Sequence, residues 1–151
     1  MQFGYGLNYL IDIENAVIVD VEATPARTYD ANHNLLTTTI PGQGTTTYTY
    51  DGLDRLTSQT DPWGQETIYT YDGSERHPTT ITNALNQTTT FDVVNGLVMS
   101  ITDADLVTTT YTYDSKRRPA TTTDEYNNVT TTLYDTQDRV TSTISPSGRT
   151  T

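Results

Sequence analysis

Large and small side chains alternate most clearly around Tyr48 and Tyr50. These two tyrosines fall on one face of an extended segment, and the threonines between them fall on the other. Residues 51–55 hold one glycine and two aspartates, which predicts a hairpin loop. Residues 56–60 predict the return strand, and residues 61–65, which include a proline and a glycine, predict the next turn. One unit is therefore two short strands and two turns.

This unit recurs along the chain with a period of about 21 residues. Each copy is marked by an aromatic residue followed by aspartate, and successive pairs are 21, 21, 20, 22 and 21 residues apart. An arginine follows the aromatic residue by five positions at Arg55, Arg76, Arg118 and Arg139. Such periodicity is typical of repeat architectures. The pairs are Tyr29 and Asp30, Tyr50 and Asp51, Tyr71 and Asp72, Phe91 and Asp92, Tyr113 and Asp114, and Tyr134 and Asp135.

The repeats predict an all-β protein in which antiparallel hairpins stack side by side. One hairpin is marginal in water, so its aromatic residues are expected to fill the interface with the next hairpin. We expect an extended, curling sheet that forms part of a β shell, preceded by a short separate hairpin. The expected domains are residues 1–28 and a repeat array of about six units over residues 29–151.

Composition narrows the possible functions. The chain has 151 residues with 8 basic and 19 acidic side chains, a formal charge of −11. This charge disfavours binding to nucleic acid and to anionic membranes. Hydrophobic residues make up only 33%, but 11 tyrosines and many threonines favour a folded β protein over a disordered chain. Without cysteine, disulfides and thiolate metal sites are excluded.

The repeat resembles the YD repeats of the RHS (rearrangement hot spot) family. The resemblance is carried by residues 48–58 and 109–114, and it covers residues 29–151. It implies a hollow β shell around a C-terminal toxin domain, or a cell-surface scaffold with proposed carbohydrate binding. The parent family is secreted or on the cell surface. This chain has no signal peptide pattern, which implies a cytoplasmic location if it is expressed as written.

Residues 1–28 lack the repeat pattern and predict a hairpin whose strands flank Glu14 and Asn15. Residues 19–24 give this stretch a similarity to a segment of DDE-type insertion-sequence transposases. We therefore expect a truncated or chimaeric reading frame, in which a transposase remnant precedes the repeats. Asp12, Asp20 and Glu22 would be the candidates for a two-metal nuclease site, although most of a DDE domain is missing.

Other candidate chemistry has a simpler interpretation in each case. Paired aspartates could bind calcium, but the spacing of a calcium loop is missing, and turn capping by aspartate is the better interpretation. The pairs are Asp51 with Asp54, Asp103 with Asp105, and Asp135 with Asp138. His33 and His77 occupy different repeat positions without a cysteine partner. The basic cluster at residues 116–118 falls in a hairpin loop, which favours a solvated surface over a nucleic-acid site.

The sequence thus predicts a non-catalytic structural segment with no cofactor and no metal. Its expected partners are neighbouring YD repeats or a second copy, through open sheet edges. A carbohydrate- or partner-binding surface built from Trp63 and exposed tyrosine rows is the alternative. A DNA-processing fragment derived from the transposase-like start is a remote third.

Overall fold

The computed structural model describes residues 7–12, 17–23 and 25–151, with side chains described from residue 25 onward. Every element in this part of the chain is a β-strand, as the sequence predicts. Among these residues, no helix is long and apolar enough to cross a membrane. The strands are β1 (Leu7–Asp12), β2 (Val17–Ala23), β3 (Ala26–Tyr29), β4 (Leu35–Ile40), β5 (Gly44–Tyr50), β6 (Leu56–Thr60), β7 (Glu66–Thr70), β8 (Thr80–Thr82), β9 (Thr88–Val94), β10 (Leu97–Thr102), β11 (Thr108–Tyr113), β12 (Pro119–Thr123), β13 (Val129–Tyr134) and β14 (Val140–Ile144).

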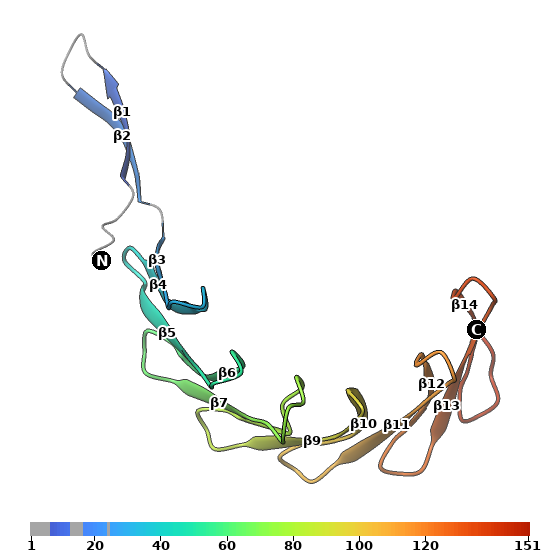
Figure 1. Cartoon of the computed structure of the whole chain (residues 1–151). Coiled ribbons are helices and arrows are strands. Elements are labelled where there is room, and N and C mark those ends of the chain that lie inside the picture. Colours follow the sequence, from blue (N-terminus) through green and yellow to red (C-terminus); the bar gives the residue numbers. More distant parts are fainter. Residues whose placement is uncertain (1–6, 13–16, 24) are drawn as a thin grey trace. The chain divides into compact units, whose positions relative to one another are not determined.

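Twelve of these strands form one open antiparallel sheet. Its order follows the sequence from β3 to β14, so each strand pairs with its neighbours along the chain (Figure 1). The sheet does not close into a barrel. β1 and β2 form a separate two-stranded antiparallel sheet, which confirms the predicted N-terminal hairpin. The predicted turn at Glu14 and Asn15 lies outside the described residues.

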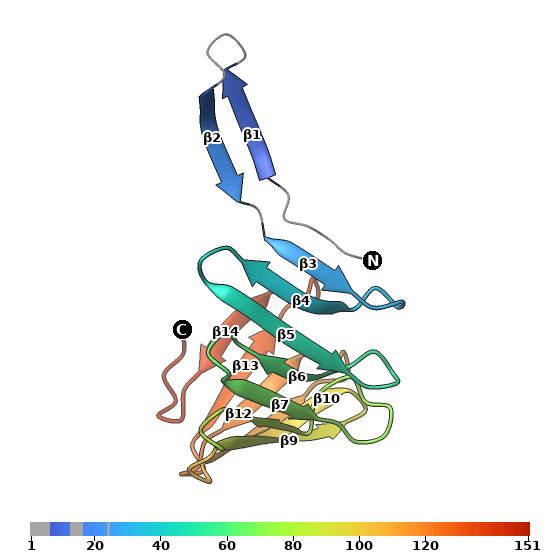
Figure 2. The ribbon, with the colours of Figure 1, turned by 90° about the vertical axis from the view of Figure 1, so that its left-hand side faces the viewer.

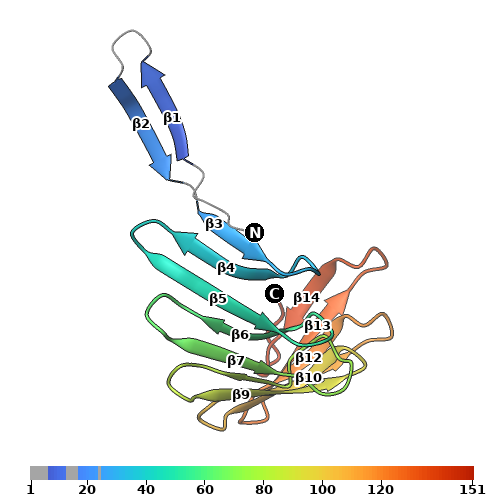
Figure 3. The ribbon, with the colours of Figure 1, turned by 60° about the vertical axis from the view of Figure 1, so that its left-hand side comes forward.

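The chain divides into two compact units, residues 1–69 and 70–151. In the first unit, β3, β4, β5 and β6 lie side by side (Figure 2). The loops of this unit alternate between the two ends of the strands: those after β3 and β5 lie on one side, and those after β4 and β6 on the other (Figure 3). The period of two strands per repeat therefore brings equivalent loops to the same side of the sheet.

Two kinds of loop result. The YD loops begin with the aspartate of an aromatic–Asp pair and comprise residues 30–34, 51–55, 114–118 and 135–139. The return loops lead to the next unit and comprise residues 61–65, 83–87, 103–107, 124–128 and 145–149. In both kinds, the backbone N–H of the first residue donates to the carbonyl of the fifth, as Asp114 does to Arg118 at 2.9 Å. This is the three-residue hairpin loop of a type I turn followed by a left-handed residue.

Threonines on adjacent strands are joined through their hydroxyl groups. The Oγ1 atoms of Thr102 and Thr108 are 2.9 Å apart, and those of Thr112 and Thr121 are 2.7 Å apart. Similar pairs join β3 to β4 and β4 to β5 in the first unit. Cross-strand threonine pairs stabilise a pleated sheet, which explains why threonine fills these strands.

Within each of the two units, the sheet is a single layer. Among the residues whose side chains are described, none is buried. Tyr48 and Tyr50 are half-buried, and the hydroxyl of Tyr50 binds the preceding hairpin. A one-layer sheet has no second surface to cover its faces, so hydrogen bonds within and between hairpins carry much of the local order.

Candidate functional site

Each YD loop is organised by the aspartate that begins it. In the 114–118 loop, Oδ1 of Asp114 accepts hydrogen bonds from the backbone N–H groups of Lys116 and Arg118, at 2.9 and 3.0 Å. Asp30, Asp51 and Asp135 make the equivalent pair of bonds in their loops. These are the backbone bonds expected of turn-capping aspartates.

Return loops use the same device, although no aromatic residue precedes them. Asp61, Asp103 and Asp124 accept from the N–H groups two and four residues later. Asn83 does so with its amide oxygen, at 2.9 Å from the N of Leu85 and 3.0 Å from that of Gln87. An acceptor oxygen is therefore what the loop requires, and the negative charge is not.

The fourth residue of each loop adopts a left-handed backbone conformation. Examples are Asp54 with φ 59°, Arg117 with φ 64° and Asp138 with φ 65°. Few non-glycine residues occupy this region, and aspartate and asparagine tolerate it best.

The fifth residue of each YD loop closes the loop through its side chain. Nε of Arg118 donates to Oδ2 of Asp114 at 2.7 Å, and Arg55 makes the same bond to Asp51 at 2.7 Å. These arginines hold the pKa of both aspartates below the usual range. In the first YD loop the amide of Asn34 replaces arginine and lowers the pKa of Asp30.

The tyrosine of the YD pair joins its hairpin to the preceding one. The hydroxyl of Tyr113 donates to the carbonyl of Val98 at 2.7 Å, and that of Tyr134 donates to the carbonyl of Pro119 at 2.8 Å. The hydroxyl of Tyr50 does the same to Leu35 at 3.0 Å, and burial raises the pKa of Tyr50. The partner in each case lies at the start of the return strand of the previous hairpin: Leu35 and Pro119 are the first residues of β4 and β12, and Val98 is the second residue of β10.

Arg118 connects two successive hairpins in three ways. Its guanidinium binds Asp114 in its own loop and Asp138 in the next, and its Cζ lies 4.3 Å from the ring centroid of Tyr134. Cation–π stacking and charge-assisted hydrogen bonds thus act on one side chain. Lys116, in the same basic cluster at 116–118, also forms an ion pair with Asp138 at 2.7 Å. Both side chains therefore bind aspartates of this protein.

Two of the predicted aromatic–Asp pairs differ from the others. Asp72 begins a longer stretch before β8, and its left-handed residue is Gly73 instead of the residue three positions after the aspartate. Phe91 and Asp92 lie inside β9, and the hairpin turns at Asn95 and Gly96, both left-handed. Phe91 pairs with Ile101 as Tyr111 pairs with Thr122. Phe91 is therefore equivalent to the first tyrosine of a unit, two residues before the YD position.

Among the residues whose side chains are described, the candidate metal ligands do not converge. Among the described residues, no group of three or more histidines, aspartates or glutamates could hold a metal ion. His33 occupies a left-handed loop position, and His77 is exposed in the stretch before β8. Asp12, Asp20 and Glu22 fall on β1 and β2, whose side chains lie outside the described part of the chain.

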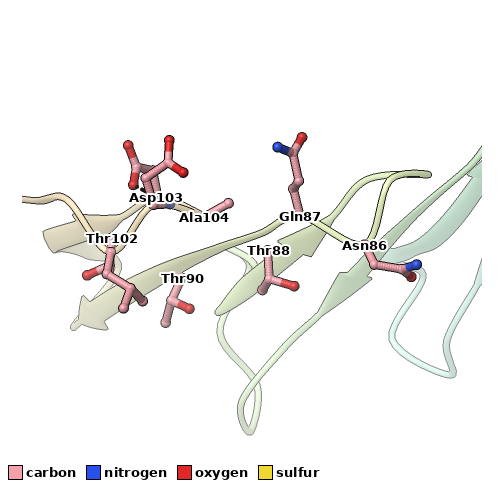
Figure 4. A pocket seen from close by; sticks show the side chains of 9 residues that line it. Asn86, Gln87, Thr88, Thr90, Thr102, Asp103 and Ala104 are labelled. Atoms are coloured by element: carbon pink, nitrogen blue, oxygen red, sulfur yellow. Dashed lines mark hydrogen bonds between the residues drawn. The ribbon is translucent and has the colours of Figure 1, made fainter.

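The return loops carry exposed aromatic side chains and a shallow hollow. Trp63 and Tyr126 occupy the same loop position, and each is 77% exposed. In the second unit, a hollow of about 400 Å³ lies between loops 83–87 and 103–107, lined by Thr88, Thr90 and Asp103 among others (Figure 4). Its lining is about equally polar and apolar, with hydroxyl, amide and carboxylate groups beside Ala104 and Leu106.

Comparison with known proteins identifies part of this pattern. The family model described as RHS Repeat matches residues 29–62 and 94–129, so these two segments are similar to RHS repeats. The match does not extend to residues 1–28. No curated protein matches the chain significantly.

Solved structures with a similar fold come from toxin complexes. A crystal structure of TcdB2-TccC3-Cdc42 has a TM-score of 0.64 and 17% identity over 86% of this chain and 7% of that chain. The Tc holotoxin pore of Photorhabdus luminescens has a TM-score of 0.48 and 18% identity over 90% of this chain and 10% of that one. This chain spans a tenth or less of either structure, and the first similarity supports a shared repeat fold.

Proposed function

We propose that residues 29–151 are a non-catalytic, structural array of RHS/YD repeats that forms part of a larger shell or surface scaffold. The observation that carries the proposal is the set of side-chain hydrogen bonds and ion pairs between successive hairpins. The tyrosine hydroxyl, the loop aspartate and the loop arginine are engaged with the neighbouring hairpin or with their own loop. Side chains engaged in this way hold neighbouring repeats together, whereas an active site presents its polar groups to a substrate.

The single-layer sheet supports the same role. The sheet of a shell has an inner and an outer face, and no described side chain is buried beneath a second layer. The fold similarity to TcdB2-TccC3-Cdc42 agrees with a place in a large toxin-associated assembly. On this proposal the parent protein acts outside the cell, and its partners are other repeat or shell components.

Substitution of Arg118 tests the structural role. Arg118→Gln removes the ion pairs to Asp114 and Asp138 and the contact with Tyr134. Because repeats contact mainly their neighbours, we expect faster amide exchange in β13 and β14 and unchanged exchange in residues 29–62. Arg149→Gln, on the last return loop, is the control with the same charge change. Equal exchange rates in the two variants would contradict the proposal.

The two outer strands of the sheet are the proposed contact sites for further repeats or a second copy. β3 and β14 stand at the two ends of the strand order, and open sheet edges recruit other strands. Sedimentation of the chain over a range of concentrations should show association. A monomer that persists at the highest concentration would count against edge contacts in this chain.

A second candidate function is glycan binding on the return-loop side. Trp63 and Tyr126 project from equivalent positions and offer flat faces that suit sugar rings. A glycan array should then give a signal that is lost in Trp63→Ala and Tyr126→Ala. An array without signal for the wild-type chain would eliminate this candidate.

The origin of residues 1–28 remains a separate proposal. A transposase remnant is supported by the wording of residues 19–24 and by the separate two-stranded sheet of β1 and β2. The neighbouring DNA should contain the ends of an insertion sequence. Magnesium- or manganese-dependent DNA nicking that disappears in Asp20→Asn would instead favour the catalytic alternative.

A further inference from the structure

The left-handed residue of a YD loop contacts the YD loop before it. In the first unit, Oδ1 of Asp54 accepts hydrogen bonds from Nδ2 of Asn32 at 2.8 Å and from Nδ2 of Asn34 at 2.7 Å. Asn32 and Asn34 are the third and fifth residues of their loop. Asp54, which accepts both bonds, is the left-handed residue of its own loop, with φ 59°.

The same contact recurs in the second unit with different donors. Oδ1 of Asp138 accepts from Nζ of Lys116 at 2.7 Å and from Nη1 of Arg118 at 2.6 Å. Lys116 and Arg118 are again the third and fifth residues of the preceding loop. Two junctions with different donor residues thus keep aspartate as the acceptor, which makes the position a point of recognition between hairpins.

A third junction reverses the polarity. The loop before 114–118 turns at Asn95 and Gly96 and offers a backbone carbonyl in place of side-chain donors. The left-handed residue that faces it is Arg117, whose Nη2 donates to the carbonyl of Asn95 at 2.7 Å. The left-handed residue therefore matches the chemistry of the preceding loop: acid against donors, and base against an acceptor.

The last YD loop presents donors of the same kind. Gln137 and Arg139 occupy its third and fifth positions, and both are exposed. The side chain of Arg139 is 72% exposed, compared with 21% for Arg118, whose loop is covered by the next hairpin. Val140, which stands where Pro119 accepts the hydroxyl of Tyr134, is exposed as well.

The outer side of β14 is also in register for another strand. Thr143 and Thr151 exchange backbone hydrogen bonds of 2.9 and 3.0 Å. Thr122 and Thr130, which lie 21 residues earlier, are partners in the ladder between β12 and β13. The interface after β14 thus begins as a continuation of the interface that already joins two hairpins.

We propose that the loop 135–139 and the outer side of β14 form a docking surface specific for a β-hairpin that carries aspartate at the left-handed position of its YD loop. The inference rests on the proposed structural role and adds the rule by which neighbouring repeats are selected. Gln137 and Arg139 supply the donors, and the carbonyl of Val140 accepts the tyrosine hydroxyl of the incoming hairpin. The first YD loop of the chain carries His33 at the matching position, so a second copy is the poorer partner.

A duplication of residues 131–151 after Thr151 tests this surface in the full chain. Since Thr151 stands where Thr130 stands in the preceding unit, the duplication continues the array in register. We compare Asp138→Asn and Asp138→Arg, made only in the appended copy, in chains with Arg139 and with Arg139→Gln. Thermal unfolding and amide exchange of β14 are the readouts.

With Arg139 present, Asp138→Asn in the appended copy should lower the unfolding midpoint by about 1–3 °C, and Asp138→Arg should lower it further. With Arg139→Gln these losses should shrink, and high salt should weaken the coupling. Strictly additive substitutions in a chain whose β14 becomes protected would overturn the docking rule alone. An extension that leaves β14 unprotected would overturn the rule and the proposed structural role together.

Discussion

Leu106 shows how backbone conformation can outweigh side-chain chemistry at a single position. It is left-handed with φ 65°, and its side chain is 82% exposed. The left-handed conformation costs about 1–2 kcal/mol for a residue with a Cβ, and little hydrophobic burial offsets that cost here. Glycine would remove the strain at some cost in chain entropy.

Leu106→Gly should therefore stabilise the protein by about 0.5–1 kcal/mol in urea unfolding, although it deletes a large apolar side chain. Leu85→Gly is the matched control, because Leu85 is 78% exposed on the preceding return loop and lies outside the left-handed region. That control should destabilise by about 0.5–1 kcal/mol. Destabilisation of equal size in both variants would refute the strain argument.

The hydroxyl of Tyr113 provides a second test at the residue scale. Tyr113→Phe removes its hydrogen bond to the carbonyl of Val98 while the ring remains. We expect a loss of about 0.5–1.5 kcal/mol in the free energy of unfolding. Tyr126→Phe should have no effect, because Tyr126 is exposed at the tip of a return loop. Indistinguishable unfolding curves for the two variants would show that the hydrogen bond of the Tyr113 hydroxyl contributes nothing to stability.

The Asp114 carboxylate gives a prediction for pH. Its pKa lies below the ordinary value of 3.8, because Arg118 donates to it and pairs with it. A lowered folded-state pKa stabilises the fold fully above about 3.8, and this contribution is lost as the pH falls through the folded value. Asn at this position keeps the loop oxygen, as Asn83 shows, but loses the ion pair.

Asp114→Asn should therefore be less stable than wild type at neutral pH, and the difference should disappear on acidification below about 3.8. Urea unfolding across this range measures the difference. Asp105→Asn, an exposed position on a return loop, controls for the change in net charge. A difference between Asp114→Asn and wild type that persists at low pH would exclude the ion pair as its cause.

Residue identities predicted the loop chemistry well, and the limits of that prediction are physical. Asp51 and Asp114 cap turns because their carboxylate oxygens accept backbone N–H groups of the loop. Phe91 and Asp92 show the failure: a chemically similar pair lies within a strand, and only the cross-strand register reveals the shift of two residues. Sequence spacing does not contain that register.

At the scale of the element, the loop between β4 and β5 depends on its two glycines in different ways. A Cβ on Gly44, which has φ +103°, would lie 2.7 Å from Cβ of Pro62 on the next return loop. A Cβ on Gly42, which has φ +77°, would meet nothing within 4 Å. Gly44, the first residue of β5, therefore permits close approach to the return loop at Pro62, while Gly42 serves only the turn.

Gly42→Ala should cost about 1–2 kcal/mol of unfolding free energy from backbone strain alone. Gly44→Ala should cost about 1–3 kcal/mol more, because the loop around Pro62 must also move. Chemical denaturation of both variants measures the difference. If Gly42→Ala proved the more damaging substitution, the close packing of these two loops would be disproved.

Element order and type could be predicted from the sequence, but contacts between hairpins could not. Alternation and turn residues located the strands around Tyr48 and Tyr113. The bonds from Lys116 and Arg118 to Asp138 connect positions about 20 residues apart, and they depend on how far one hairpin is displaced along the next. The sequence shows that these residues recur; only the register shows that they meet.

At the scale of the whole molecule, the low hydrophobic content agrees with the absence of buried side chains among the described residues. With 33% hydrophobic residues the chain builds a single-layer sheet, and none of the side chains described is buried. Tyr50, Tyr113 and Tyr134 are half-buried, and their hydroxyl groups bind the preceding hairpin. Each hairpin depends on its neighbours for hydrogen bonds, as expected of a repeat array.

Residue-resolved amide hydrogen exchange of the full chain tests the repeat array most directly. We predict protected segments that coincide with β4 to β13 and recur with the period of about 21 residues seen in the sequence. The N–H groups bound by loop aspartates, such as those of Leu53 and Lys116, should be slowed as well. Rapid exchange throughout residues 29–151, or protection without this period, would contradict the account.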